Sequence, residues 1–280
     1  MKILITGANG MVARAAADYC NSIGDSVTAL TRNELDISKI GEVSDLVGSL
    51  RPDAIINCAA YTDVDGSETH VERCFAANST GVANLALAAR IVDARFVTIS
   101  TDYVFDGGKD GFYTQRDTPN PLGAYARAKL EGENRARDNY ARSVIVRTGW
   151  IYGNGGTNFL SVMADLLGQG KSIKAIYDSF GTPTYAVDLA RRLRELAELD
   201  MPCVFHVTNA GDGTSYAGFA EKVCDLMGYD RQLLEPAAAE TLKRPAPRPP
   251  NCKLACLFSK PFGLAPLPDW EDALKRFLIG

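Results

Sequence analysis

A tyrosine and a lysine four residues apart, Tyr125 and Lys129, are the residues of this chain with the clearest chemical potential. Residues at this spacing share one face of a helix. An ammonium group beside a phenol favours the phenolate, so we expect Lys129 to lower a tyrosine pKa that is normally about 10. A tyrosine tuned in this way transfers protons near neutral pH, as the reduction of a ketone or the oxidation of an alcohol requires.

The start of the chain indicates a dinucleotide site. Residues 2–6 form the continuous apolar run of a buried parallel strand, and an alanine-rich helix is predicted over Arg14–Ser22. Glycines in the turn between them let the backbone approach a pyrophosphate, to which the helix N-terminus offers amide donors. The spacing is GxxGxxA and not the standard GxGxxG. The turn therefore indicates a dinucleotide site mainly because it lies between a strand and a helix. The predicted cofactor contacts in this turn are Gly7, Asn9, Gly10, Met11 and Val12.

The strand, the glycine turn and the Tyr-x-x-x-Lys pair together resemble the extended branch of the short-chain dehydrogenase/reductase superfamily. Four further segments are similar to dTDP-4-dehydrorhamnose reductases, namely residues 57–65, 100–105, 147–153 and 248–251. The Ser-Thr-Asp-Tyr-Val-Phe run at 100–105 is the most specific, because related epimerases usually carry a different sequence there. The likeness extends from Met1 to about Trp270 and covers nearly the whole chain.

This resemblance implies a reaction. NADPH would deliver a hydride to the 4-keto carbon of a nucleotide-linked deoxysugar, most simply dTDP-4-dehydrorhamnose, and the product dTDP-L-rhamnose would serve cell-surface polysaccharide synthesis. Tyr125 would protonate the forming alkoxide. Thr101 would donate a hydrogen bond to the carbonyl oxygen, where negative charge develops. Lys129 would stabilise ionised Tyr125 and also bind the nicotinamide ribose.

Three more residues are candidates for substrate binding. Asp102 would contact the sugar or orient the site, although a strand-end cap explains it equally well. Trp150 offers a flat apolar wall, or is a buried structural residue. Arg248 occupies the family's Arg-Pro-x-Asn position and suits a diphosphate, unless it only pairs with a surface acid. Cys252 stands where the family more often has serine, which puts one phosphate or sugar contact in doubt.

Cofactor choice depends on the end of the second predicted strand. There the chain has Thr31-Arg32, and a guanidinium accommodates the 2′-phosphate of NADP(H). Glu34 could instead compete for the ribose, so NAD(H) is the alternative cofactor. By resemblance, the remaining cofactor contacts are Asp36 and Ile37 beside the adenine, and Ala60, Tyr61 and Thr62 beside the nicotinamide.

Alternating apolar patterns predict an α/β fold, a Rossmann-like doubly wound parallel sheet with a smaller C-terminal substrate lobe. Further strands are predicted over Ser26–Thr31, Asp53–Asn57, Arg95–Ser100 and Ser143–Thr148, and helices over Lys39–Leu50, Val71–Val92, Leu122–Ala141 and Trp270–Leu278. Residues 1–150 would form the NADP-binding domain and residues 151–280 mainly the substrate lobe. Cys203–Thr208 would return to the sheet, and Leu242–Pro250 would be an extended loop.

Composition limits the other function classes. A net charge of -4 gives no reason to expect nucleic acid or an anionic membrane as a partner, and no apolar run approaches the ~20 residues that span a bilayer. Seven cysteines at irregular spacing and the absence of a signal-peptide pattern indicate the cytoplasm. Some family members are associated with magnesium, but no cluster of acids indicates a site, so we expect no metal ligands.

Two rival functions are also compatible with the sequence. One is a ketoreductase or epimerase acting on a different nucleotide sugar. The other is a non-catalytic regulatory subunit that keeps the fold, similar to the β subunit of methionine adenosyltransferase. The intact Thr101, Tyr125 and Lys129 weigh against the second. The oligomeric state is also open, with a homodimer among the alternatives.

Overall fold

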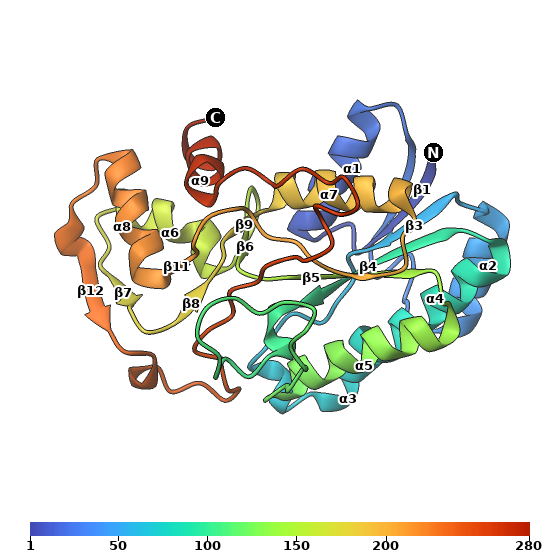
Figure 1. Ribbon diagram of the computed structural model, residues 1–280, viewed down its shortest axis with the longest axis horizontal. Coiled ribbons are helices and arrows are strands. Elements are labelled where there is room, and N and C mark those ends of the chain that lie inside the picture. Colours follow the sequence, from blue (N-terminus) through green and yellow to red (C-terminus); the bar gives the residue numbers. More distant parts are fainter.

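The computed structural model describes residues 1–280, and its centre is a six-stranded parallel sheet (Figure 1). The strands follow the order β10-β5-β4-β3-β1-β2. Their bounds are β1 (Lys2–Thr6), β2 (Ser26–Leu30), β3 (Ala54–Asn57), β4 (Arg95–Thr101), β5 (Ser143–Thr148) and β10 (Val204–His206). The chain runs outward from β1 to β2 and then returns to the other side of β1 as β3. The strand order therefore reverses between β1 and β3, where doubly wound sheets bind their ligands.

Helices cover both faces of this sheet. Helices α1 (Met11–Ser22) and α7 (Ala186–Leu199) lie on one face, and α2 (Ile40–Leu50), α4 (Gly81–Val92) and α5 (Ala124–Asn139) on the other (Figure 1). Successive side chains of a strand point to opposite faces, so Ile3 and Ile5 pack with α1 and α7, whereas Leu4 packs with α2 and α4. The predicted doubly wound α/β architecture is confirmed.

The predicted helix over residues 71–92 is not uniform. It consists of α3 (Val71–Phe75), a π-helical turn (Ala76–Thr80) and α4. Asn78 in that turn is 1% exposed, and its side chain accepts a hydrogen bond from the Tyr61 N–H and donates one to the Tyr61 carbonyl, both at 2.9 Å. The π turn, a feature often found at functional sites, thus fixes the segment that follows β3.

A second group of elements forms a smaller lobe, on the left of Figure 1. It contains α6 (Phe159–Gly168), α8 (Tyr216–Met227), α9 (Trp270–Ile279) and the short paired strands β7 (Ile173–Ile176) with β12 (Leu234–Ala237), β8 (Phe180–Gly181) with β11 (Thr214–Ser215), and β6 (Ile151–Tyr152) with β9 (Thr184–Tyr185). Its apolar cluster, centred on Tyr152, Phe219 and Trp270, is separate from the clusters that flank the sheet. None of the helices in the chain is both long and apolar enough to cross a bilayer.

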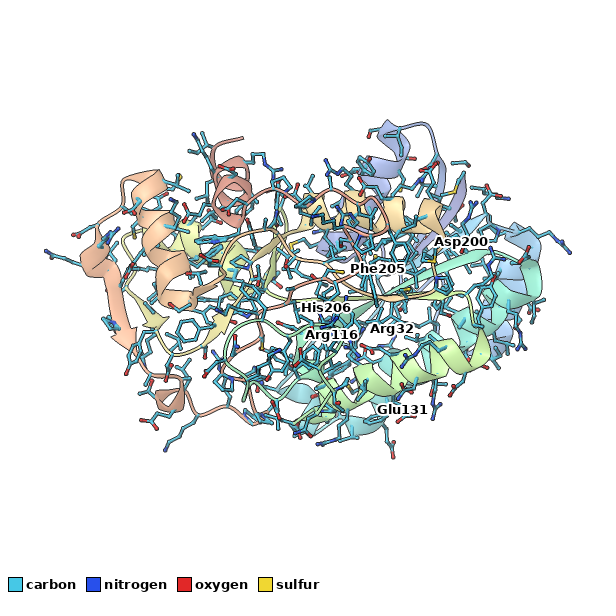
Figure 2. The ribbon with its side chains drawn as sticks, in the orientation of Figure 1. Arg32, Arg116, Glu131, Asp200, Phe205 and His206 are labelled. Carbon is cyan, nitrogen blue, oxygen red and sulfur yellow. The ribbon has the colours of Figure 1, made fainter.

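The two groups of elements are interleaved along the chain. Strand β10 pairs in parallel with β5, as predicted for residues 203–208, and α7 also packs on the large sheet. Figure 2 shows Phe205 and His206 of β10 in the middle of the molecule. The division of the chain at residue 150 stays a prediction.

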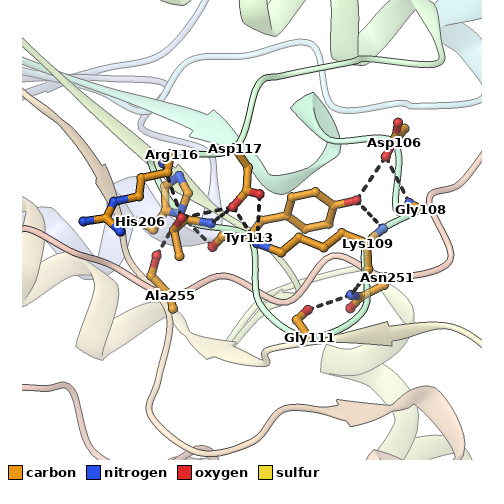
Figure 3. A network of polar contacts seen from close by, with 11 residues as sticks. Asp106, Gly108, Lys109, Gly111, Tyr113, Arg116, Asp117, His206, Asn251 and Ala255 are labelled. Carbon is orange, nitrogen blue, oxygen red and sulfur yellow. Dashed lines mark hydrogen bonds and ion pairs between the residues drawn. The ribbon is translucent and has the colours of Figure 1, made fainter.

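Residues 242–255, which we call the strap, run from the smaller lobe across the loop that follows β4. Its first half has neither β-strand nor α-helix, as predicted for residues 242–250. Figure 3 shows how its second half is tied down: the Asn251 side chain donates to the carbonyls of Lys109 and Gly111, both at 2.7 Å. The N–H of Tyr113 donates to the carbonyl of Lys253 at 2.7 Å. These bonds fix the strap to the loop that follows β4.

Candidate active site

The three residues predicted to be catalytic lie together at the end of β4. Tyr125 and Lys129 occupy successive turns of α5 on the face toward the sheet, and Thr101 is the last residue of β4. The Thr101 hydroxyl lies within hydrogen-bonding reach of the Tyr125 phenol. Lys129 is 4% exposed, and its Nζ donates to the carbonyl oxygen of Ile99 at 2.6 Å.

The electrostatics of this set differ from the expectation in one respect. Burial raises the pKa of Tyr125 well above its usual value, and the hydrogen bond with Thr101 only partly opposes this. The predicted lowering by Lys129 is therefore wrong in direction, because desolvation of the phenolate is the largest effect and the Lys129 ammonium donates to the Ile99 carbonyl. Burial also lowers the pKa of Lys129 to about 8. The carboxylate of Glu133 acts in the opposite direction and raises this pKa.

Asp102 is buried beside the catalytic set. It is 3% exposed, and its Oδ1 accepts a hydrogen bond from the Thr101 hydroxyl at 3.0 Å, whereas its Oδ2 has no partner. Burial raises the pKa of Asp102 to about 7, and the hydrogen bond with Thr101 opposes the rise. A Cβ at Gly149 would lie 1.9 Å from Oδ2, so the glycine makes room for the carboxyl. The carboxyl is thus held at the site by Thr101 and by the space that Gly149 leaves.

Cys252, the departure from the family pattern, lies against this carboxyl. It is 2% exposed, its thiol donates to the Pro249 carbonyl at 3.8 Å, and burial together with the nearby Asp102 carboxyl raises the pKa of the thiol. Tyr103 meets the Tyr125 ring edge-on at a centroid distance of 6.2 Å. A small pocket over Tyr125 is lined by Val64, Tyr103, Leu122, Gly123, Tyr125, Ala126, Pro247 and Pro249. The strap therefore reaches the phenol that the sequence predicts to be the proton donor.

The glycine turn has the geometry that a dinucleotide requires. Gly7 has a φ of +77°, and a Cβ there would lie 2.8 Å from the backbone of Ala59, so no other residue fits without a shift. The N–H of Gly10 donates to the Gly7 carbonyl at 2.8 Å. Helix α1 then begins at Met11 without a side-chain cap. Its first amide groups are therefore available to an anion at the switch point of the sheet.

Arg14, which sequence reasoning missed, joins this turn to the smaller lobe. Its guanidinium donates to the carbonyls of Asn9, Asn154 and Gly155, the last at 3.1 Å. The predicted contact Met11 lies beneath the same loop, because a Cβ at Gly156 would come within 2.8 Å of its sulfur. The loop between β6 and α6 is thus held against the predicted cofactor turn.

The residues at the end of β2 are arranged in a way that leaves Arg32 accessible. The Glu34 carboxylate accepts hydrogen bonds from the N–H and the hydroxyl of Thr31, each at 2.8 Å, and so serves as a local cap. The Arg32 side chain is 67% exposed and 3.6 Å from the carboxylate of Asp36. The Ile37 side chain is buried against Gly81 of α4. A guanidinium, and not a free carboxylate, is therefore presented at this strand end.

Both remaining substrate candidates have partners within the protein. Trp150 adopts a left-handed backbone with φ of +50° and stacks on Tyr216 at a centroid distance of 4.0 Å. Arg248 lies with its Nη2 3.1 Å from the Asp65 carboxylate, and the same carboxylate accepts a hydrogen bond from the Ala246 N–H at 3.1 Å. Pairing with an acid, the alternative considered for Arg248, is thus present in the structure.

The sheet, its glycine turn and the Thr-Tyr-Lys set at the end of β4 define the class of protein as a short-chain dehydrogenase/reductase. The protein-family model described as the RmlD substrate binding domain matches residues 1–279. A dTDP-4-dehydrorhamnose reductase of Mycolicibacterium smegmatis is 38% identical over 98% of this chain and 84% of its own length. The chain therefore belongs to the dTDP-4-dehydrorhamnose reductase family.

Solved structures agree with this assignment. A dTDP-4-dehydrorhamnose reductase from Clostridium acetobutylicum superposes with a TM-score of 0.94 at 36% identity, covering 99% of this chain and 98% of that one. The Bacillus anthracis reductase in complex with NADP gives a TM-score of 0.95 at 33% identity, covering 100% of this chain and 99% of that one.

Proposed function

We propose that this protein is an NADPH-dependent reductase that converts dTDP-4-dehydrorhamnose to dTDP-L-rhamnose. The observation that carries the proposal is the convergence of Thr101, Tyr125 and Lys129 at the carboxyl end of β4, in a chain similar along its whole length to proteins named for this reaction. The raised pKa of Tyr125 supports its role as an acid, because the phenol keeps its proton until the alkoxide forms.

The proposed roles follow from position. Bound NADPH supplies the hydride. Tyr125 donates the proton to the substrate oxygen, and the Thr101 hydroxyl beside it orients that oxygen. Lys129 holds a positive charge behind Tyr125, within the same buried space. Asp102 contacts the sugar or orients Thr101 by accepting its hydrogen bond.

The residues present fit a dinucleotide. Gly7, Gly10 and the uncapped start of α1 offer a tight turn and amide donors for the pyrophosphate. The exposed Arg32 favours NADP(H), which is bound in the Bacillus anthracis relative, and Glu34 is engaged with Thr31 instead of a ribose. Asn78 fixes the Tyr61 backbone. By resemblance to the family, we assign residues 60–62 to the nicotinamide side of the cofactor.

The smaller lobe and the strap would bind the nucleotide sugar. We assign Trp150 to the sugar and Arg248 to the diphosphate, with residues 1–150 as the cofactor domain and residues 151–280 as mainly the substrate lobe. The seven cysteines are all free thiols, which supports a cytoplasmic site of action. For the assembly we propose a homodimer, and light scattering on the purified protein would test it.

A substrate panel tests the proposal. Purified protein is mixed with NADPH and with dTDP-4-dehydrorhamnose, dTDP-4-keto-6-deoxyglucose or a UDP-linked 4-keto sugar, and NADPH oxidation is followed by absorbance. We expect the highest kcat/KM with dTDP-4-dehydrorhamnose. Equal or higher activity with another sugar would move the protein to the related ketoreductases. No oxidation with any of them, together with co-purification of a larger enzyme, would favour a regulatory subunit.

A further inference from the structure

A buried carboxylate lies one helical turn beyond Lys129. Glu133 is 2% exposed, and both of its oxygens are engaged. Its Oε1 accepts hydrogen bonds from the Ser100 hydroxyl at 2.5 Å and from Arg147 Nε at 2.9 Å, and its Oε2 accepts one from Arg147 Nη2 at 2.7 Å. Arg147 itself is only 5% exposed. A buried ion pair of this kind gives weak net stability compared with apolar packing, so its presence calls for another explanation.

Each member of this buried set adjoins a residue of the candidate active site. Ser100 immediately precedes Thr101 on β4. Arg147 lies on β5, two residues before Gly149, which makes room for the Asp102 carboxyl. Glu133 is four residues after Lys129 and therefore lies on the same face of α5. This buried set thus connects β4 and α5, which hold the catalytic residues, with the neighbouring strand β5.

The surroundings of Lys129 offer one anionic group to offset its burial. The groups that face it are Cys74 from α3, Cys58 from the loop after β3, and Glu133 from its own helix. Burial raises the pKa of the Cys58 thiol to about 12 and also raises that of Cys74, so both are neutral at physiological pH. On β4, the Ile99 carbonyl contributes a dipole and no charge. Glu133 is therefore the carboxylate that opposes desolvation of the ammonium.

We propose that Glu133 is a positioning residue of the reductase site, whose carboxylate keeps Lys129 charged behind Tyr125 while Arg147 limits the strength of that effect. In this arrangement Arg147 prevents a full, uncompensated negative charge from lying beneath the active site. Ser100 fixes one carboxylate oxygen and so sets the orientation of the group. The kinetic part of this inference rests on the proposed function, whereas the electrostatic part does not.

The electrostatic part is tested by titrating Lys129 directly. The protein is prepared with ¹³Cε-labelled lysine, and the Lys129 signal is assigned by its loss in Lys129→Arg. The wild type should titrate with a pKa of about 8. Glu133→Gln keeps the shape and an acceptor but leaves the Arg147 charge unopposed, so the pKa of Lys129 should fall by about one unit or more. Arg147→Gln should move it in the opposite direction.

Opposite shifts separate this role from a merely structural one. Loss of packing alone would change the Lys129 titration in the same direction in both variants, or not at all, and either result overturns the proposal. Because a single buried charge is destabilising, the double variant Glu133→Gln/Arg147→Gln serves if a single variant fails to fold. Its Lys129 pKa should lie between those of the wild type and Glu133→Gln. A double variant indistinguishable from the wild type would also overturn the proposal.

The kinetic part is tested by the pH dependence of kcat/KM. Activity should fall as Lys129 loses its proton, so Glu133→Gln should shift the alkaline limb to lower pH by the amount that the titration gives. The matched control is Glu131→Gln, because Glu131 lies on the outer side of the same helix and pairs with Arg135 at the surface (Figure 2). Its pH profile should equal that of the wild type. An unshifted limb in Glu133→Gln contradicts the proposal, whereas an inactive wild type refutes only the proposed function.

Discussion

The guanidinium of Arg248 and the carboxylate of Asp65 meet at 3.1 Å and join the strap to the loop that follows β3. The same carboxylate also accepts a hydrogen bond from the strap backbone at Ala246. Both side chains are partly exposed, so solvent weakens the pair. A diphosphate that reaches Arg248 would therefore compete with Asp65 for the guanidinium. Substitutions of Arg248 and of Asp65 can thus distinguish diphosphate binding by Arg248 from a role in anchoring the strap.

Arg248→Ala and Asp65→Asn are expected to have opposite effects on dTDP binding. Loss of the guanidinium removes a charge-assisted contact worth about 1.5–3 kcal/mol, so dTDP affinity should fall roughly tenfold or more. Asp65→Asn removes the competing charge, and dTDP affinity should stay equal or rise. Calorimetric titration of both variants with dTDP provides the measurement. If Arg248 only anchors the strap, the two variants would weaken dTDP binding equally, and the diphosphate site would lie elsewhere.

Tyr125→Phe tests the proton donor. The substitution removes the hydroxyl and leaves the ring that packs edge-on against Tyr103. The fold and NADPH affinity should persist, while turnover falls by at least ~10²-fold, the usual contribution of a positioned acid. Steady-state turnover and fluorescence titration with NADPH measure the two quantities. Turnover near that of the wild type would remove Tyr125 from the mechanism.

Arg32→Ala tests cofactor selectivity. The Arg32 side chain is exposed and only loosely paired with Asp36, so its loss should leave the fold unchanged. The KM for NADPH should rise roughly tenfold or more, while the KM for NADH stays almost constant, because only NADPH carries the 2′-phosphate. An equal change for both cofactors would make Arg32 a structural residue, and Glu34 would then be the residue to examine.

Asp102 should make stability depend on pH. Burial raises its folded-state pKa to about 7, whereas an unfolded aspartate titrates near about 3.9. Between these values the folded protein binds more protons than the unfolded chain, so this group makes stability fall as pH rises, and the full cost is present above about pH 7. Asp102→Asn, which cannot ionise, should gain stability relative to the wild type at about pH 8 but not at about pH 4. Urea unfolding at the two pH values measures this, and a gain independent of pH would contradict the assignment.

The features predicted correctly from the sequence are those that local pattern determines. A strand, a glycine turn and a helix follow each other within residues 2–22, so the β1–α1 unit can be recognised without any distant contact. The pairing of Tyr125 with Lys129 follows from helical spacing alone, and the position of Thr101 follows from the end of β4. Expectations of this kind depend on neighbours in the chain, and the structure places all three residues together.

The features that were missed depend on contacts between distant segments. The π turn at Asn78 is accommodated because Gly132 on α5 has no Cβ, which would lie 2.1 Å from the Asn78 carbonyl oxygen. The partners of Glu133 come from β4 and β5, and the partner of Arg248 comes from the loop after β3. The direction of the Tyr125 pKa was wrong for the same reason, since burial is set by the whole fold and not by the i,i+4 pair.

Isotope labelling can follow hydride transfer from NADPH to C4 of the sugar. The protein is incubated with dTDP-4-dehydrorhamnose and NADPH deuterated at the transferable position, and the product is isolated and analysed by NMR and mass spectrometry. We expect dTDP-L-rhamnose with one deuterium, located at C4. Recovery of unlabelled sugar, or deuterium at any other carbon, would contradict it.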